Sequence, residues 1–312
     1  MKIDSILDFV GNTPLLKVNN IIKNHKLYAN LYVKLEMFNA SGSVKMRIVK
    51  SIIMEGIKNG KIDDKTMIVE ASSGNTGIAL ACLCARLGLN LTVVMPESVS
   101  NERKQLIKIY GANLVLTPAS LGMDGALQEV NNMYKKDNNI FLLSQFNNLI
   151  NPLTHQKTTA VEIYDDLNGN VDVVICGIGS GGTITGLGNY LHMVGDTTII
   201  GVEPTESPLI TSGIANSHKI EGIGANFIPD VLDREVIDKI ITIDYEQALL
   251  GVNMLASEEG VFVGISSGAA FMVGYKEALK SSNYDKNIVV ILPDSGERYL
   301  SKLEDKILWL VV

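Results

Sequence analysis

Short runs of apolar and β-branched residues alternate along the chain with longer segments that carry apolar residues at helical spacing. Runs of about four to eight such residues between turn signals are typical of buried strands, and the longer segments are typical of helices. The predicted strands span residues 31–38, 66–70, 91–95, 113–116, 140–143, 171–176, 198–203, 239–243 and 287–292. The predicted helices span residues 75–87, 101–110, 125–135, 155–167, 246–258 and 268–279, and another begins near 182. Repeated strand–helix units indicate an α/β fold with parallel-rich sheets flanked by helices.

The length of the chain and one break in this pattern predict two domains. A chain of 312 residues exceeds what a single hydrophobic core usually serves. The strand–helix pattern is interrupted near residues 147–152. We therefore expect an N-terminal α/β domain at 1–147 and a C-terminal α/β domain at 148–312, with the first strands of the chain able to pack on the second domain.

The composition narrows the functional classes. Hydrophobic residues make up 46% of the chain, charged residues 20%, and the formal net charge is −7. A mildly acidic chain without a basic cluster argues against nucleic acid and anionic membrane surfaces as partners. No stretch reaches the roughly 18 apolar residues of a spanning helix, and the N-terminus lacks a signal-peptide pattern. The three cysteines form neither a disulfide framework nor a metal-binding spacing. We expect a cytoplasmic protein without a metal site.

A lysine stands where a strand-like run gives way to an apolar segment. Lys45 follows Ser41, Gly42 and Ser43, and residues 48–53 after it are mostly apolar. These neighbours would place the amine in a cleft, where partial burial lowers the pKa of an ammonium group and frees the amine for Schiff-base chemistry. A solvated surface charge is the alternative interpretation of a lysine at a helix start.

The loop Ser72-Ser73-Gly74-Asn75-Thr76-Gly77 precedes a helix that is apolar on nearly every side. Its N–H groups and hydroxyls gather at the N-terminus of that helix, where the helix dipole favours an anion such as a carboxylate. We expect the hydroxyls of Ser72, Ser73 and Thr76 to contact that carboxylate. Simple capping of the helix by Ser73 or Asn75 is the alternative.

A glycine-rich loop, Gly177-Ile178-Gly179-Ser180-Gly181-Gly182-Thr183, follows a predicted strand and opens a predicted helix. With Glu203 about 20 residues further on, it has the spacing of a dinucleotide-binding fingerprint. The same backbone N–H groups, with the hydroxyls of Ser180 and Thr183, would equally hold a single phosphate. Taken alone, this loop leaves a nicotinamide or flavin enzyme and a monophosphate-binding enzyme open.

The three motifs together favour pyridoxal 5′-phosphate as the cofactor and an amino acid as the substrate, because this chemistry needs a lysine, a carboxylate-binding loop and a phosphate cradle. Longer blocks carry a resemblance: the chain resembles the cysteine synthase (O-acetylserine sulfhydrylase) family of fold-type II pyridoxal-phosphate enzymes. The matching blocks are Gly11-Asn12-Thr13-Pro14-Leu15, Ser43-Val44-Lys45, Ser73 through Ala81, Gly222-Ile223-Gly224-Ala225, Gly264 through Ala270 and Leu292 through Leu300. The resemblance implies a two-domain fold like that of the tryptophan synthase β subunit, with the cofactor in the interdomain cleft.

The resemblance also implies roles for matching positions. Lys45 would form the Schiff base with the cofactor and later remove the substrate α-proton. Asn75 would hydrogen-bond the ring hydroxyl, and Ser266 would face the pyridine nitrogen. The phosphate would bind at Gly179, Ser180, Gly181, Gly182 and Thr183. The substrate carboxylate would bind to Ser72, Ser73, Thr76 and Gln145.

The implied activity is β-replacement on a β-substituted L-serine, with O-acetyl-L-serine and sulfide giving L-cysteine and acetate. The resemblance further implies a homodimer that can bind the C-terminal tail of a serine acetyltransferase. Asn226 stands where these enzymes usually have glycine, in a loop near the active-site mouth. An amide there would contact a longer or more polar partner, which keeps open an L-cysteine-consuming enzyme that releases hydrogen sulfide and forms serine, lanthionine or another thioether. A nicotinamide dehydrogenase and a non-catalytic regulatory module are the remaining alternatives.

Overall fold

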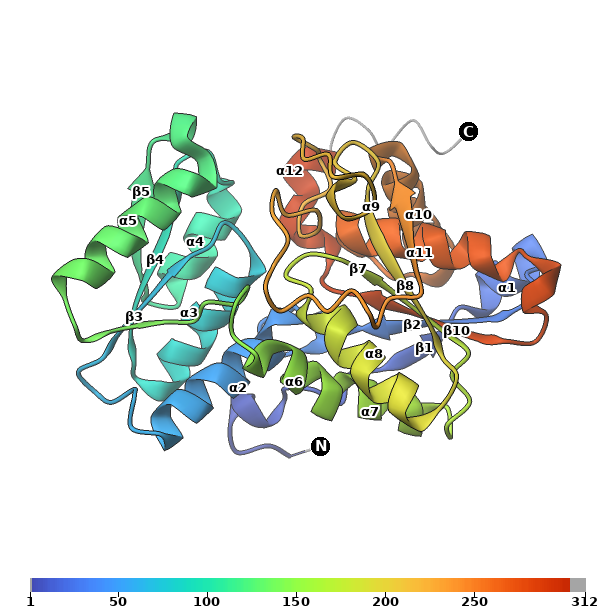
Figure 1. Ribbon diagram of the computed structural model, residues 1–312, viewed down its shortest axis with the longest axis horizontal. Coiled ribbons are helices and arrows are strands. Elements are labelled where there is room, and N and C mark those ends of the chain that lie inside the picture. The colour runs from blue at the N-terminus through green and yellow to red at the C-terminus, as the bar shows by residue number, and fades with distance from the viewer. Residues whose placement is uncertain (1, 304–312) are drawn as a thin grey trace. The chain divides into compact units, whose positions relative to one another are not determined.

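A computed structural model describes residues 2–303, which form two compact units (Figure 1). The first unit contains residues 2–10 and Asn39–Ile150, and the second contains Gly11–Phe38 and residues 151–303. The chain therefore enters the second unit early, leaves it at Asn39 and returns at Asn151. The boundary expected at residue 147 lies close to this return, and residues 11–38, which contain the first strands, belong to the second unit.

The first unit is built on a four-stranded sheet of order β5-β4-β3-β6, in which all neighbours run parallel. Its strands are β3 (Met67–Ala71), β4 (Asn90–Pro96), β5 (Asn113–Thr117) and β6 (Ile140–Leu142). Its helices are α2 (Lys45–Lys58), α3 (Asn75–Leu87), α4 (Asn101–Ile109) and α5 (Gly122–Lys136).

Both faces of this sheet are covered, because successive side chains of a strand point to opposite faces. On one face, Ile68 and Val93 join an apolar cluster with buried residues of α2 and α3. On the other face, Val69 and Val94 pack against Ala126 and its neighbours on α5. The carboxyl end of β3 is thereby fixed inside the unit, and it leads into the loop before α3.

The second unit is built on a six-stranded sheet of order β1-β2-β10-β7-β8-β9. Its strands are β1 (Leu15–Lys17), β2 (Asn30–Leu35), β7 (Val173–Gly177), β8 (Thr198–Pro204), β9 (Lys239–Ile243) and β10 (Asn287–Leu292). Its helices are α1 (Asn19–His25), α6 (Ile150–Lys157, whose first residue belongs to the first unit), α7 (Thr159–Asp166), α8 (Gly182–Val194), α9 (Leu209–Ser212), α10 (Tyr245–Glu259), α11 (Ile265–Ala278) and α12 (Leu300–Leu303). Only the β1–β2 pair is antiparallel among these strands.

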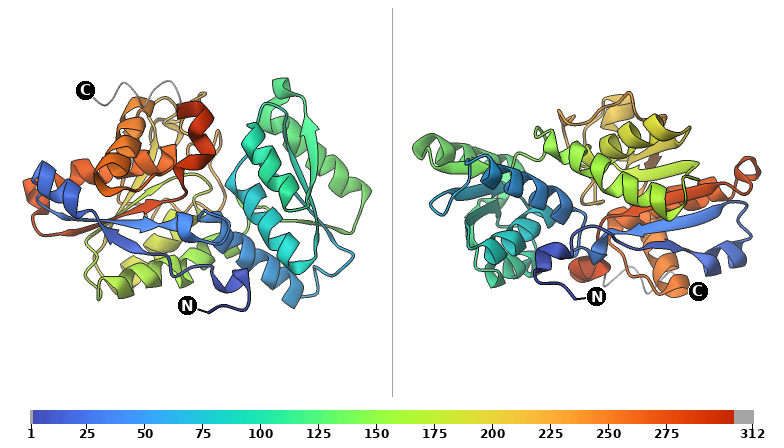
Figure 2. Two further views of the ribbon diagram at one scale, coloured as in Figure 1. Left: turned by 180° about the vertical axis from the view of Figure 1, so that it is seen from behind. Right: turned by 90° about the horizontal axis from the view of Figure 1, so that it is seen from below.

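Helices cover both faces of the second sheet as well (Figure 2). One apolar cluster joins Ile175 and Val290 to buried residues of α10 and α11. A second cluster joins Val174 and Val289 to residues of α7 and α8. The alternation of neighbouring strand residues between the two clusters is the pattern of a doubly covered parallel sheet. The predicted α/β class with parallel-rich sheets flanked by helices is confirmed.

Most predicted elements lie within a few residues of the observed ones, and two expectations need correction. The helix predicted at 155–167 is two helices, α6 and α7, separated at Thr158, which has a φ of −125°. The Thr158 hydroxyl donates a 2.7 Å hydrogen bond to the carbonyl of Thr154, which satisfies that carbonyl locally at the break. Strand β1 and helix α1 were not predicted. Among residues 2–303, no helix is long and apolar enough to cross a membrane.

Candidate functional site

Lys45 is the first residue of α2, and its side chain is half-buried. Gly42 before it has a φ of 74°, a left-handed conformation that favours glycine, and this turn carries the chain into the helix. Val44 and Met46, on either side of the lysine, are buried. The helix dipole disfavours a positive charge at a helix N-terminus, which suits an amine used as a nucleophile. The buried hydroxyl of Ser43 has no hydrogen-bond partner within residues 2–303.

The loop that leads into α3 is organised by Ser72. The Ser72 hydroxyl accepts hydrogen bonds from the N–H groups of Gly74 at 3.3 Å and Gly77 at 3.0 Å. Helix α3 begins at Asn75, and its N-cap, Gly74, makes no side-chain capping bond. The N-cap is therefore Gly74 rather than Ser73 or Asn75, and the hydroxyl that accepts N–H groups at this helix start is that of Ser72. Ser73 and Asn75 are half-buried and remain able to contact a ligand.

A second segment of the first unit meets this loop at Thr76. The Thr76 hydroxyl donates a 2.8 Å hydrogen bond to the Oε1 atom of Gln145, and both side chains are buried. Gln145 follows Ser144, which has a φ of 54°, unusual for a residue other than glycine. The structure thus brings together two of the residues expected to bind a carboxylate, although they lie 69 positions apart.

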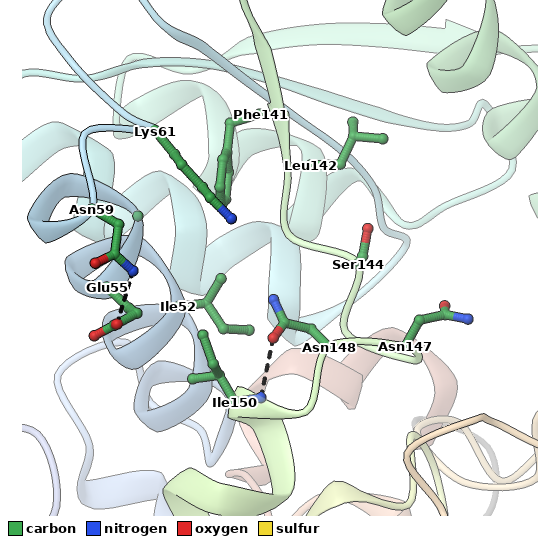
Figure 3. A pocket seen from close by; sticks show the side chains of 11 residues that line it. Ile52, Glu55, Asn59, Lys61, Phe141, Leu142, Ser144, Asn147, Asn148 and Ile150 are labelled. Carbon is green, nitrogen blue, oxygen red and sulfur yellow. Dashed lines mark hydrogen bonds between the residues drawn. The ribbon is translucent and has the colours of Figure 1, made fainter.

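The first unit also has a surface pocket of about 340 Å³ beside the same turn (Figure 3). Glu55 and Lys61 line it, together with Phe141, Ser144 and Asn148. None of the residues expected to hold a cofactor or substrate lines this pocket. The pocket is therefore separate from the candidate site, which rests on the Thr76–Gln145 pair and the helix starts.

In the second unit, the glycine-rich loop connects β7 to α8. The N-cap of α8 is Gly181, with a φ of 84°. A methyl group on Gly179 would overlap the carbonyl of Gly222, and one on Gly182 would overlap the side-chain amide of Asn151. At a helix N-terminus, glycine positions let the backbone approach an anion closely and present its N–H groups to that anion. The loop therefore fits a phosphate group.

Two residues of α6, Asn151 and His155, support this loop. Asn151 donates a 3.1 Å hydrogen bond from Nδ2 to the Ser180 hydroxyl. The Nε2 atom of His155 lies 3.2 Å from the Thr183 hydroxyl, and its Nδ1 lies 2.9 Å from that of Thr159. His155 is only 2% exposed, so it is a buried support of the loop rather than an isolated packing residue.

Ser266 and the segment around Gly222 lie beside the same loop. Ser266 is buried near the start of α11, and its Oγ lies 3.5 Å from where a methyl group on Gly222 would stand. Because Gly222 also contacts Gly179 closely, the second unit gathers the phosphate loop and Ser266 in one place. Asn226, four residues beyond Gly222, is exposed.

The carboxylate of Glu203 is occupied within the protein. It accepts hydrogen bonds from the N–H groups of Ile210 at 2.9 Å and Thr211 at 3.1 Å, and also from the Thr211 hydroxyl. The residue is 1% exposed. A ribose-binding acid must offer its carboxylate to the ligand, so the geometry does not support the dinucleotide interpretation of the loop.

Each unit carries its own set of candidate groups. The first unit carries the amine of Lys45 and the residues expected to bind a carboxylate, and the second carries a phosphate cradle and the Ser266 hydroxyl. An amine, a phosphate cradle and a hydroxyl are the kinds of group that pyridoxal phosphate needs, since it binds through a lysine, its phosphate and its ring nitrogen. In the part of the chain that the structure describes, no cluster of three metal-ligating side chains occurs.

Comparisons with known proteins agree with this chemistry. The sequence profile of the family described as "Pyridoxal-phosphate dependent enzyme" matches residues 6–294. Cysteine synthase B of Campylobacter jejuni is 45% identical over 299 residues, covering 96% of this chain and 97% of the relative. The structure of a cysteine synthase from Entamoeba histolytica superposes with a TM-score of 0.94 at 39% identity, covering 98% of this chain and 91% of that one. A hydrogen sulfide-producing enzyme from Fusobacterium nucleatum has a TM-score of 0.91 at 41% identity, covering 96% and 100%.

Proposed function

Since the chain belongs to the family of pyridoxal-phosphate-dependent enzymes, we propose that it is a β-replacement enzyme that acts as a cysteine synthase. It would convert O-acetyl-L-serine and sulfide into L-cysteine and acetate. The observation that carries this proposal lies in the first unit. Lys45 begins α2, Asn75 begins α3, these two helices share one apolar cluster, and the buried Thr76–Gln145 pair adjoins the start of α3.

The residues of the chain divide the work of holding the cofactor. The Lys45 amine would attach it, the N–H groups of residues 179–183 would bind its phosphate, and Asn75 would hydrogen-bond its ring hydroxyl. Ser266 would offer a neutral hydroxyl, rather than a carboxylate, to the ring nitrogen. When bound, the cofactor supplies an aldehyde for covalent attachment and a ring that withdraws electrons from the substrate α-carbon.

The substrate would be oriented by its carboxylate. Ser72, Ser73, Thr76 and Gln145 would hold that group. In the proposed mechanism the substrate α-hydrogen would then face the Lys45 amine. Lys45 Nζ would take the α-proton, and acetate would leave the β-carbon with the electron pair of the C–O bond. Hydrosulfide would then form the C–S bond at the same carbon, and Lys45 would return a proton to the α-carbon. One amine thus serves as base and then as acid.

A second candidate runs the chemistry from L-cysteine. In that case sulfide is the leaving group, and water or a thiol is the second substrate, giving serine, lanthionine or another thioether. The likeness to the hydrogen sulfide-producing enzyme from Fusobacterium nucleatum and the exposed amide of Asn226 favour it. Asn226→Gly should then lower the ratio of cysteine turnover to O-acetylserine turnover. An unchanged ratio would remove Asn226 as a determinant.

The assembly and location of the protein form part of the same proposal. We infer a cytoplasmic homodimer in which residues 1–147 and 148–312 serve as the two domains, with residues 11–38 packed in the second. A serine acetyltransferase tail is the partner that the family resemblance suggests. Gel filtration with light scattering, alone and with a peptide of such a tail, measures both associations.

The deciding experiment is a visible spectrum of the purified protein with pyridoxal phosphate, before and after O-acetylserine or L-cysteine is added in separate cuvettes. Sulfide release is followed alongside. A cofactor band that changes with O-acetylserine, with little sulfide released from cysteine, supports a cysteine synthase. Ready release of sulfide from cysteine supports the second candidate. A protein that binds no cofactor contradicts both.

The attachment site is tested separately. Borohydride reduction followed by peptide mass spectrometry should place the cofactor on Lys45, and Lys45→Ala should lose both the modification and turnover. Lys58→Ala is the matched control, because Lys58 is an exposed lysine in the last turn of the same helix. Turnover that survives Lys45→Ala would contradict the catalytic role of this lysine.

A further inference from the structure

Glu70 is a buried acid that neither the proposed mechanism nor the sequence motifs use. It lies near the end of β3, two residues before Ser72, and is 7% exposed. Its Oε2 accepts a 3.4 Å hydrogen bond from the N–H of Ser144, and the neighbouring N–H of Leu143 also acts to lower the pKa of this carboxylate. The acid therefore binds the backbone directly in front of Gln145.

The turn that Glu70 contacts needs support from outside. Ser144 has a φ of 54°, and a left-handed conformation of a residue other than glycine is strained and persists only where the surroundings hold it. On the carbonyl side, Asn148 donates from Nδ2 to the Leu143 carbonyl at 3.2 Å, and the N–H of Asn148 donates to the Ser144 carbonyl at 2.9 Å. On the N–H side, Glu70 is the acceptor. The turn is thus held from both sides.

The direction of Gln145 follows from this turn. Gln145 is buried and accepts a hydrogen bond from Thr76 at 2.8 Å. We propose that Glu70 is a positioning residue, which holds the turn at Leu143 and Ser144 so that Gln145 stays against Thr76 and ready for the substrate carboxylate. This inference rests on the carboxylate-binding role of Gln145 in the proposed function.

The surroundings of Glu70 supply no counter-charge. Strands β4 and β6, which flank β3, contain no charged residue. Glu70 shares the face of β3 with Ile68, which packs against α2 and α3, and α5 packs on the opposite face. The charged residues of α2 and α3 are Lys45, Arg47, Lys50, Glu55, Lys58 and Arg86, and none of them shifts the pKa of Glu70. The charged residues of α5 are Asp124, Glu129, Lys135 and Lys136. None of them forms an ion pair with Glu70 among the pairs of residues 2–303. Burial raises the pKa of Glu70 to about 7, although the N–H groups of Ser144 and Leu143 oppose that rise.

The ionised and neutral forms of Glu70 would hold the turn differently. A carboxylate offers a charged oxygen to the N–H of Ser144, whereas the neutral acid offers an uncharged carbonyl oxygen, which is a weaker acceptor. Glu70→Gln has the shape of the neutral acid and cannot ionise. The variant should therefore behave at every pH as the wild-type protein behaves below the pKa of Glu70.

The test measures the dissociation constant of the complex between L-alanine and the holoenzyme by spectral titration. The titrations run from about pH 5.5 to about pH 8.5, because this range brackets the Glu70 pKa of about 7. L-Alanine has the α-carboxylate and no leaving group. At high pH, Glu70→Gln should bind it about fivefold more weakly than wild type, the difference between a charge-assisted and a neutral hydrogen bond. At low pH the two proteins should converge. The ratio of the two dissociation constants at each pH does not depend on the ionisation of the L-alanine amine, because both proteins bind the same ligand.

Glu97→Gln is the matched control. Glu97 also accepts a backbone N–H, that of Ala119 at 3.1 Å, in the same unit but away from the turn. This variant should follow the wild-type profile. If Glu70→Gln does not fold, Glu70→Asp keeps the charge and shortens the side chain, and it should weaken alanine binding while keeping the pH dependence.

Two results would overturn the inference and are distinguishable. If Glu70→Gln and wild type have the same dissociation constant for L-alanine across the pH range, the positioning role of Glu70 is contradicted and the proposed function is not. Failure of wild type and Glu97→Gln to bind L-alanine, while both hold the cofactor, contradicts the proposed function and this inference with it.

Discussion

The Nδ2 atom of Asn151 donates a 3.1 Å hydrogen bond to the hydroxyl of Ser180, and the same amide fills the space beside Gly182. One residue of α6 therefore fixes a hydroxyl of the phosphate loop and leaves no room for a side chain at the start of α8. The requirement for glycine at position 182 is thus a matter of packing against Asn151. The contact with Asn151 also makes the shape of the phosphate loop depend on α6, which precedes the loop in the chain.

This relationship predicts the effect of a single methyl group. Gly182→Ala should weaken pyridoxal phosphate binding by about tenfold, because overpacking a buried site typically costs 1–3 kcal/mol. Asn151→Ala removes the overlapping amide, so the double variant should bind the cofactor better than Gly182→Ala alone. Equilibrium dialysis against the cofactor measures the affinities.

Gly195→Ala is the control for that series. Gly195 is the C-cap of the same helix, has an extended backbone and has no atom within 4 Å of where a methyl group would stand. Its substitution should leave cofactor affinity unchanged. Additive effects of Gly182→Ala and Asn151→Ala would show that the two positions are not coupled.

The His155–Thr183 contact gives a second prediction about the same loop. His155→Leu removes the ring nitrogen that lies 3.2 Å from the Thr183 hydroxyl, and the dissociation constant of the cofactor should rise about fivefold for the loss of one buried hydrogen bond. Thr159→Val removes only the contact on the other side of the ring, at 2.9 Å. It should lower thermal stability while changing cofactor affinity less than twofold, as a rough bound. Equal losses of affinity in both variants would contradict a specific role of Thr183.

Local patterns were sufficient to predict much of the framework. The predicted bounds of α3 (residues 75–87) and β10 (287–292) equal the observed ones, because each contains a continuous run of apolar residues and glycine, at 77–85 and 288–292. The glycine-rich loop was placed correctly at the start of α8 for the same reason. Strand β1 has three half-buried residues, which is too short for a periodic signal.

The supports of the site could not be predicted, since they depend on contacts between distant segments. Asn151 meets Ser180 across 29 positions, His155 meets Thr183 across 28, and Glu70 meets Ser144 across 74. The residues next to His155 and Glu70 in the sequence give no local sign of such a partner. The break between α6 and α7 is also hidden, because Thr158 is neither glycine nor proline.

The Thr76–Gln145 hydrogen bond predicts a change in substrate affinity. Thr76→Val keeps the shape of the side chain and removes the hydroxyl that donates to Gln145 at 2.8 Å. We expect KM for O-acetylserine to rise about tenfold, since a buried amide oxygen is left without its partner. Thr76→Ser retains a hydroxyl and should restore most of the affinity. Steady-state kinetics of the two variants provide the measurement.

Thr92→Val is the control for this substitution. Thr92 is a buried threonine on β4 of the same unit, and its hydroxyl donates a 3.5 Å hydrogen bond to the sulfur of Met67. The same change of side chain there should leave KM unaltered. If Thr76→Val and Thr76→Ser have the same KM, the hydroxyl does not orient Gln145.

The raised pKa of Glu70 predicts how stability depends on pH. Burial raises the pKa of this acid from 4.5 to about 7 in the folded protein. The folded state therefore binds the proton more tightly than the unfolded state, and the free energy of unfolding falls as pH rises from about 4.5 to about 7. At about 1.4 kcal/mol for each pKa unit, the contribution lost is on the order of 3 kcal/mol.

Glu70→Gln cannot ionise, so this loss should be absent from the variant. Urea unfolding of both proteins at the two ends of the window measures the difference, and parallel decreases in stability would contradict the assignment to Glu70. The ionised form of Glu70 thus lowers the stability of the fold through its burial, while it is the better acceptor for the N–H of Ser144.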